Sequence, residues 1–221
     1  WVSLSRGGGG GAPHRPPVMF KKAVEFKSQT TVGGKPLKKL KSDAAACFPL
    51  TGEDAGLVFP PKAEINCRKV AQGGSKTQVY FCGSTPILVD GGRGDYAPTV
   101  MACWLCPDML PCFYVPQQVS KFVCGGADLM LPGVLGMSHE NMLVNSLACV
   151  QVMGNPAPIA VGVVLFDPGS HSVSEGRVMS ALTWYGDCLW EAAGKPVPNE
   201  GFKDGYVESI GAPCPVGGGG E

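Results

Sequence analysis

The sequence predicts an α+β fold in two parts, a small α/β domain followed by a small β-barrel. Hydrophobic residues make up 44% of the 221 residues and charged residues only 16%, so the chain can bury one or two apolar cores. The first half combines one amphipathic helical pattern with several strand-like runs. In the second half short apolar runs recur between turn residues, a spacing typical of a small barrel.

Glycine and proline divide the chain further. Of the 32 glycines and 20 prolines, twenty lie in residues 1–18 and 192–221, which predicts unstructured ends. We expect residues 1–18 to be a disordered leader, with Met19 as a candidate true start, and residues 192–221 to be a flexible linker or a truncated end. The α/β domain is then expected at 19–108 and the barrel at 109–191.

In the first domain, Leu37, Leu40 and Ala44 share one face of a helix that Pro49 ends. Gly73 and Gly74 separate two strand-like runs, as in a hairpin. The elements expected here are, in order, a strand at 20–28, a helix at 37–48, a loop at 51–61, strands at 65–70, 77–82 and 86–89, and a further apolar run at 99–105.

In the second domain, Val119, Phe122 and Val123 recur at helical spacing, and Gly125 is expected to close their helix in a left-handed conformation. Phe113 and Tyr114 lead into this helix. The elements expected here are, in order, a helix at 116–124, a strand at 129–131, a turn at 132–133, strands at 147–153 and 159–166, and a long closing strand at 177–190.

The segment 121–136 is the organising feature of the second domain, because a helix, a bare Gly-Gly loop and a strand follow one another. Gly125, Gly126 and Ala127 are expected to expose amide N–H groups that sugar or phosphate oxygens can approach, beside the polar Asp128. The alternative is local: the glycines cap and turn the chain, and Asp128 bonds to nearby amides.

A longer set of motifs resembles a known family. The string GGADLMLPGV at 125–134 resembles the helix-to-strand loop of PUA domains, which are small RNA-binding β-barrels. Further matches follow in order at 19–30 (MFKKAVEFKSQT), 86–88, 96–100 (YAPTV), 104, 107–111 (PDMLP), 154–160 (GNPAPIA) and 189–190. Over residues 19–191 the chain resembles the pre-PUA and PUA region of ligatin-type eukaryotic translation initiation factors.

Charge is unevenly distributed, with a net of +4 over residues 19–110 and −4 over 111–191. Seven lysines lie between residues 19 and 41 against the single acid Glu25. Such a run contacts phosphates or forms a solvated face. Among the aromatic residues, Phe166 and Tyr185 are candidates for stacking on a base, although core packing is the commoner role. The predicted RNA-binding residues are Gly125, Gly126, Ala127, Asp128, Lys121, Phe166, Tyr185, Lys21, Lys22, Lys27, Lys38, Lys39 and Lys41.

The ten cysteines are expected to be reduced thiols that fill the core of a cytoplasmic protein, because the sequence shows no signal peptide and no apolar run that would span a membrane. Cys103 and Cys106 form a CxxC, but no second ligand pair has zinc-site spacing. No nucleophile elbow, HExxH or Walker motif occurs. We therefore expect no catalytic residue, no metal and no cofactor.

The resemblance implies a non-enzymatic, RNA-binding translation factor fragment that contacts the small ribosomal subunit and the acceptor end of tRNA. It also implies roles in GTP-independent delivery of initiator tRNA, in reinitiation and in ribosome recycling, although the later domains of ligatin are not seen in these residues. Two alternatives stay open. One is a protein-interaction module that pairs with an SUI1-domain partner, which the acidic second half favours. The other is the PUA accessory domain of a tRNA-modifying enzyme.

Overall fold

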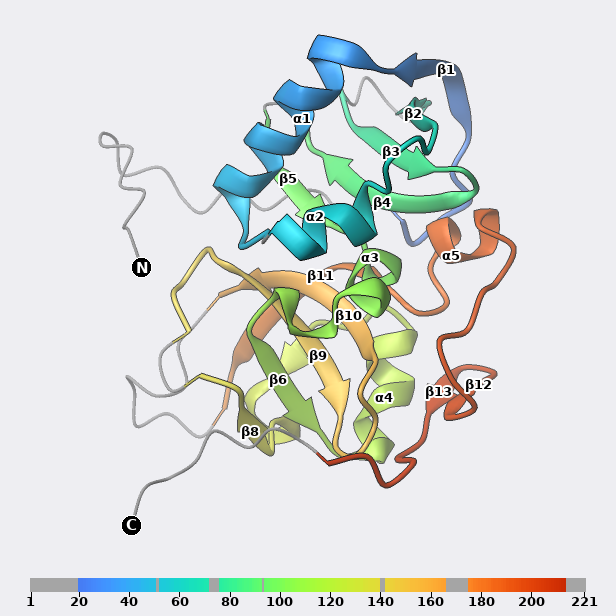
Figure 1. The fold of residues 1–221 in the computed structure, drawn as a ribbon. Coiled ribbons are helices and arrows are strands. Elements are labelled where there is room, and N and C mark those ends of the chain that lie inside the picture. The colour runs from blue at the N-terminus through green and yellow to red at the C-terminus, as the bar shows by residue number, and fades with distance from the viewer. Residues whose placement is uncertain are drawn as a thin grey trace.

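The computed structural model describes residues 20–50, 52–71, 76–92, 94–139, 142–165 and 175–213. These residues form a five-stranded sheet, a six-stranded sheet and a two-stranded ribbon, with short helices between them (Figure 1). The first sheet and its helices make an α/β domain, and the second sheet curls into a half-barrel. The predicted α+β class is therefore confirmed.

The first sheet has the order β1-β2-β3-β4-β5, and each strand is antiparallel to its neighbours. Helix α1 (Gly34–Cys47) packs on this sheet through the buried side chains of Leu40 and Ala44, two of the residues that the helical pattern placed on one face. The strands are β1 (Phe26–Val32), β2 (Ile65–Val70), β3 (Gln78–Cys82), β4 (Thr85–Asp90) and β5 (Tyr96–Pro98).

Two expectations for this domain are wrong. Residues 52–58 were expected to be loop, but they form α2 (Gly52–Val58), in which Glu53 and Asp54 occupy the first turn and Val58 is buried. Acidic side chains there are favoured by the helix dipole. The first strand begins at Phe26 rather than at residue 20.

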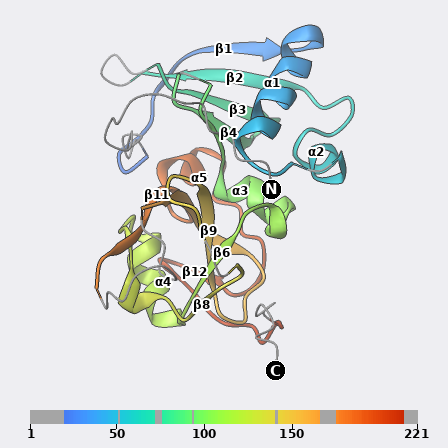
Figure 2. The ribbon, with the colours of Figure 1, turned by 90° about the vertical axis from the view of Figure 1, so that its left-hand side faces the viewer.

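The apolar run at 99–105 is a helix that joins the two sheets. In α3 (Val100–Leu105) the Thr99 side chain caps the N-terminus by accepting from the Ala102 amide. The Val100 amide donates to Thr183 Oγ1 at 3.0 Å, and Trp104 Nε1 donates to the Pro158 carbonyl at 2.8 Å. Figure 2 shows α3 between the two sheets. Its buried side chains belong to a core cluster that includes residues of both domains, and Trp104 also contacts the barrel core.

The second sheet has the order β7-β11-β10-β9-β6-β8. Strand β6 was not expected; it pairs in parallel with β9, from Cys112 opposite Cys149 to Val115 opposite Val152. The elements of this domain are the 3-10 turn η1 (Pro107–Met109), β6 (Cys112–Val115), α4 (Gln117–Cys124), β7 (Leu129–Met130), the 3-10 turn η2 (Leu131–Gly133), β8 (Gly136–Met137), β9 (Leu147–Val152), β10 (Pro158–Val164) and β11 (Arg177–Trp184).

The expected closing strand at 177–190 is shorter than predicted. Strand β11 ends at Trp184, Gly186 adopts φ +93°, and Asp187 caps the short helix α5 (Cys188–Ala192). The Cys188 amide donates to the Phe20 carbonyl at 3.1 Å. The start of the first domain is therefore fastened to the end of the barrel.

The described residues beyond 192 contradict the expected flexible linker. Strands β12 (Phe202–Lys203) and β13 (Tyr206–Val207) form a ribbon in which Phe202 and Val207 are buried in the barrel core. Asn155 Nδ2 donates to the Glu208 carbonyl, and Asn199 Nδ2 donates to Asn155 Oδ1 at 2.9 Å. These bonds and the buried side chains hold the segment on the barrel despite its glycine and proline content.

The two domains share packed side chains. One core cluster combines first-sheet residues such as Ile87 and Leu88 with Tyr114, Cys149 and Leu189 of the second domain. Trp104 and Trp190 contact this cluster and also the barrel core. The two domains therefore pack against each other through a shared apolar interface.

Candidate nucleic-acid interface

The predicted Gly-Gly loop is the C-terminal cap of α4. The Gly126 amide donates to the Val123 carbonyl at 2.9 Å, and the Ala127 amide donates to the Phe122 carbonyl at 3.0 Å. Gly126 has φ +78°, whereas Gly125 has φ −80°. This is the Schellman arrangement, with Gly126 as the left-handed residue. The expectation that Gly125 takes the left-handed conformation is wrong by one position.

This cap uses the amides that were expected to meet RNA. The Gly125 amide donates to the Lys121 carbonyl at 3.1 Å, so all three loop amides satisfy helix carbonyls. An N–H group that already donates to a carbonyl is not a ready site for a phosphate oxygen. The expected exposure of these amides is therefore wrong, and the local alternative describes the backbone correctly.

Gly126 is nevertheless a close contact point between distant parts of the chain. A Cβ at this position would lie 2.6 Å from Cζ2 of the buried Trp184, and 3.2 Å from Cε of Lys21. Gly126 is buried, while Gly125 and Ala127 are exposed. A lysine of the first domain therefore lies against the loop of the second.

Asp128 is held by β11. Its Oδ2 forms an ion pair with Arg177 Nη1 at 3.1 Å, and its Oδ1 accepts from Ser180 Oγ at 3.1 Å. The Asp128 side chain is 16% exposed and that of Arg177 is 51% exposed. The pair therefore fixes a cation at the surface, while the carboxylate faces the sheet.

Phe122 is the exposed aromatic side chain of this region. Its spacing predicted a helix face shared with Val119 and Val123, but the structure buries Ser120, Val123 and Cys124 and leaves Phe122 59% exposed. Lys121 Nζ lies 5.1 Å from the Phe122 ring centroid. We call this surface the α4–β7 corner; it consists of Lys21, Lys121, Phe122, Gly125, Gly126, Ala127, Asp128 and Arg177.

Sequence reasoning missed Phe122 and Arg177 as members of this surface. Local spacing gave no signal that Phe122 is exposed, because an apolar stripe at i, i+3 and i+4 includes adjacent positions such as Phe122 and Val123. Arg177 gave no local signal, since it lies 49 positions from Asp128. The strand pairing of β7 with β11 brings the two together.

The lysines of the first domain do not form a single cluster. Lys21 lies at the corner and Lys22 is its exposed neighbour, whereas Lys38 and Lys39 are on α1 beyond the far end of β1. Seven residues of strand separate these groups by about 20 Å. Lys27 is exposed on β1 between them.

Two of the α1 lysines are engaged within the protein. Lys39 Nζ pairs with Asp43 Oδ2 at 3.6 Å. Lys41 Nζ donates to the Phe59 carbonyl at 3.4 Å and lies 5.2 Å from the Phe59 ring centroid. Lys41 therefore packs against Phe59 within the first domain and is not part of the α4–β7 corner.

Of the two aromatic candidates, Tyr185 is part of the core and Phe166 lies outside the described residues. The Tyr185 hydroxyl donates to the Lys203 carbonyl at 2.9 Å, and its ring packs edge-on against Trp190 and Phe202. Burial raises the pKa of this phenol. The predicted stacking role of Tyr185 is wrong, because only 4% of the residue is exposed.

The CxxC cysteines have the environment of core residues. Burial raises the pKa of Cys103 well above the usual range and raises the pKa of Cys106 to about 11, whereas a reactive thiol has a lowered pKa. Within the described ranges, His, Cys, Asp and Glu side chains form no group of three that would hold a metal ion. In the same residues, no helix has the length and apolar character to cross a membrane.

Two family models match the chain in succession. The Pre-PUA-like domain matches residues 20–107, and the PUA domain of eIF2D matches residues 110–188. The chain is 37% identical over 186 residues to eukaryotic translation initiation factor 2D of Oryctolagus cuniculus, covering 81% of this chain and 33% of that protein. It therefore spans about a third of the length of such relatives.

A second kind of relative is matched over its whole length. Translation machinery-associated protein 20 of Eremothecium gossypii is 24% identical over 180 residues, covering 78% of this chain and 97% of that protein. Among solved structures, a PUA domain of Aeropyrum pernix has a TM-score of 0.60 at 18% identity, covering 77% of this chain and 92% of that one. A hypothetical protein of Pyrococcus horikoshii has a TM-score of 0.59 at 17% identity, covering 75% and 99%. These structures share the fold.

Proposed function

Because this chain belongs to the family of eukaryotic translation initiation factor 2D (ligatin), with a pre-PUA and a PUA domain, we propose that it binds RNA during translation. In this proposal it contacts the small ribosomal subunit and the acceptor end of tRNA. It acts without enzymatic activity or a cofactor, in the cytoplasm, in GTP-independent delivery of initiator tRNA, in reinitiation and in ribosome recycling. The observation that carries the proposal is the α4–β7 corner, where both domains contribute cations beside an exposed aromatic ring.

The corner supplies two kinds of contact that single-stranded RNA uses. Lys21, Lys121 and Arg177 provide charge for phosphates. Phe122 provides an exposed ring on which a base can stack, worth about 1–3 kcal/mol per base. Since Lys21 comes from the pre-PUA domain and the others from the PUA domain, the complete surface depends on the packing of the two.

The glycine loop has a different role in this proposal from the one that its sequence suggested. Gly125, Gly126 and Ala127 form a low, side-chain-poor surface that lets an RNA strand approach the flanking cations, while their amides stay in the helix cap. Asp128 orients Arg177. Lys22 and Lys27 add long-range attraction from the first domain.

The test is binding of the purified chain to tRNA and to a single-stranded oligonucleotide with the tRNA 3′-end sequence. Phe122→Ala is expected to weaken binding about 5- to 150-fold if one base stacks there. Leu135→Ala is the matched control, because Leu135 is also 59% exposed in the same domain. Equal affinities of the two variants would reject the corner as the RNA site.

The cations are tested by salt dependence. Lys21→Ala and Lys121→Ala are each expected to reduce the slope of log affinity against log salt by about one. Lys203→Ala, an exposed lysine on β12, is the control and is expected to leave the slope unchanged. If the slope of Lys21→Ala equals that of the wild type, the result would argue against a surface shared by the two domains.

A second candidate function is that of a protein-interaction module with an SUI1-domain partner. The observation that favours it is the match to 97% of the length of translation machinery-associated protein 20, a protein about as long as this two-domain unit. The net charge of −4 over residues 111–191 also suits a protein partner. A pull-down of such a partner that survives RNase treatment would support this function over RNA binding.

A further inference from the structure

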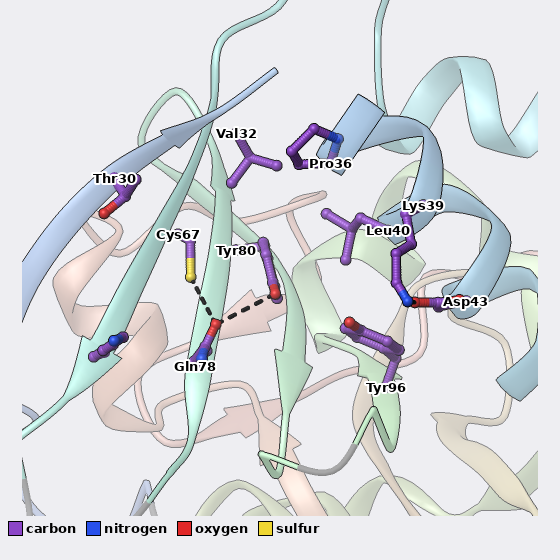
Figure 3. Close-up of a pocket in the computed structure, with 11 residues that line it drawn as sticks. Thr30, Val32, Pro36, Lys39, Leu40, Asp43, Cys67, Gln78, Tyr80 and Tyr96 are labelled. Carbon is purple, nitrogen blue, oxygen red and sulfur yellow. Dashed lines mark hydrogen bonds and ion pairs between the residues drawn. The ribbon is translucent and has the colours of Figure 1, made fainter. Parts of the chain in front are cut away.

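The first domain contains a cavity on the side away from the α4–β7 corner. It has a volume of about 340 Å³ and lies between α1 and the face of the sheet formed by β1, β2, β3 and β5 (Figure 3). Helix α1 closes one side, and strands β1 and β2 extend past it. This volume lies in the range of small-molecule sites.

A fixed amide forms part of the cavity wall. Gln78 Oε1 accepts hydrogen bonds from Cys67 Sγ at 3.0 Å and from the Tyr80 hydroxyl at 3.4 Å, as the dashed lines in Figure 3 show. Two donors on one oxygen hold the side-chain amide in a single orientation. Among the described residues its Nε2 group has no hydrogen-bond partner, so its two N–H donors are open to water or to a ligand.

Two tyrosine rings form an aromatic wall beside this amide. The Tyr80 and Tyr96 ring centroids are 6.1 Å apart, with an interplanar angle of 55°. Tyr80 is 8% exposed and serves as the base of the cavity, while Tyr96 is half-buried at its edge. Burial is the main cause that raises the pKa of both phenols, so both rings are neutral at physiological pH and offer faces for stacking.

Charged groups lie around the opening of the cavity. Lys39 and Asp43 come from α1, with Nζ and Oδ2 3.6 Å apart, and Lys69 comes from β2. Asp90 also lies near Tyr96, and its Oδ1 accepts from the Gly92 and Gly94 amides. Both signs are thus present at the opening: α1 carries Lys39 and Asp43, and β2 carries Lys69.

From this arrangement we propose that the cavity binds one nucleotide unit, either a free nucleotide or one nucleotide of a single-stranded RNA. The base stacks on Tyr96 and accepts a hydrogen bond from the Gln78 amide. Asp43 accepts from ribose hydroxyls, and Lys69 and Lys39 contact the phosphate. The RNA source rests on the proposed function, whereas the free-nucleotide source does not.

The experiment is calorimetric titration of the full chain with AMP, UMP, uridine and inorganic phosphate. Saturable binding of a mononucleotide with a dissociation constant on the order of 1 mM or lower is expected. Tyr96→Ala is expected to weaken it by at least about fivefold, and Tyr96→Phe to retain most of it because the ring remains. Tyr206→Ala, which removes an exposed tyrosine on β13, is the control.

Two further titrations test the phosphate contact and distinguish a free nucleotide from a nucleotide of RNA. Lys69→Ala should weaken AMP binding severalfold and leave uridine binding unchanged. If the ligand is a nucleotide of RNA, AMP competes with a short single-stranded oligonucleotide for the protein, and Tyr96→Ala weakens binding of the oligonucleotide. If the ligand is a free nucleotide, AMP does not compete and Tyr96→Ala leaves oligonucleotide binding unchanged.

Absence of saturable nucleotide binding, or phosphate binding as tight as AMP binding, would overturn the inference. The proposed function fails separately, through unchanged RNA affinity of Phe122→Ala.

Discussion

Asp187 gives the protein a pH-dependent stability that can be calculated from its surroundings. Its carboxylate accepts from the Trp190 amide at 2.8 Å and from the Trp184 amide at 3.0 Å, and so joins β11 to α5. The residue is 2% exposed. Burial is the main cause that raises its pKa from 3.8 to about 7, against the lowering effect of the backbone hydrogen bonds.

A carboxyl with a raised pKa in the folded protein binds a proton more readily when folded than when unfolded. Its contribution to stability is therefore fully present below pH 3.8 and is lost as the pH rises through about 7. Between about pH 5.5 and about pH 7.5 this loss amounts to roughly 1–2 kcal/mol. The Asp187→Ala variant lacks this dependence and also loses a helix cap, which costs about 1 kcal/mol.

The assay is urea denaturation of the wild type and of Asp187→Ala at both pH values. Other titrating groups are common to the two proteins, so the difference between their unfolding free energies isolates Asp187. We expect this difference to be larger at the lower pH by roughly 1–2 kcal/mol. A difference that is constant, or that increases with pH, would refute the reasoning.

Three further predictions follow from the packing. Gly126→Val should lower the unfolding free energy by about 2 kcal/mol or more, because Gly126 has a φ of +78° and a Cβ there would contact Trp184. A urea denaturation curve like that of the wild type would contradict this. Because the variant is expected to be less stable, it does not test RNA binding by itself. Phe202→Ala should cost about 3–5 kcal/mol, as for a core ring, whereas a residue in a loose linker would cost almost nothing in a thermal melt. In mass-spectrometric alkylation of the folded chain, exposed Cys47 should react well before buried Cys103, and equal rates would show that the core opens.

Much of the backbone could be read from local patterns. Strand β2 occupies residues 65–70 as predicted, and the helix at 34–47 was expected at 37–48. The Gly-Gly pair correctly predicted the end of α4. Such patterns succeed because spacing and turn residues fix which backbone conformations are accessible within a few positions.

The site was decided by contacts between distant residues. The sequence by itself determined that two glycines follow a helix and that lysines are concentrated in the first half. The bonds that occupy the loop amides are also local, because their acceptors lie within five positions upstream. Only the tertiary structure turned Phe122 outward, paired Arg177 with Asp128 and brought Lys21 against Gly126. The physical reason is that side-chain exposure and partners depend on which strands and helices pack together, and residues far apart in the chain carry no local pattern that specifies this packing.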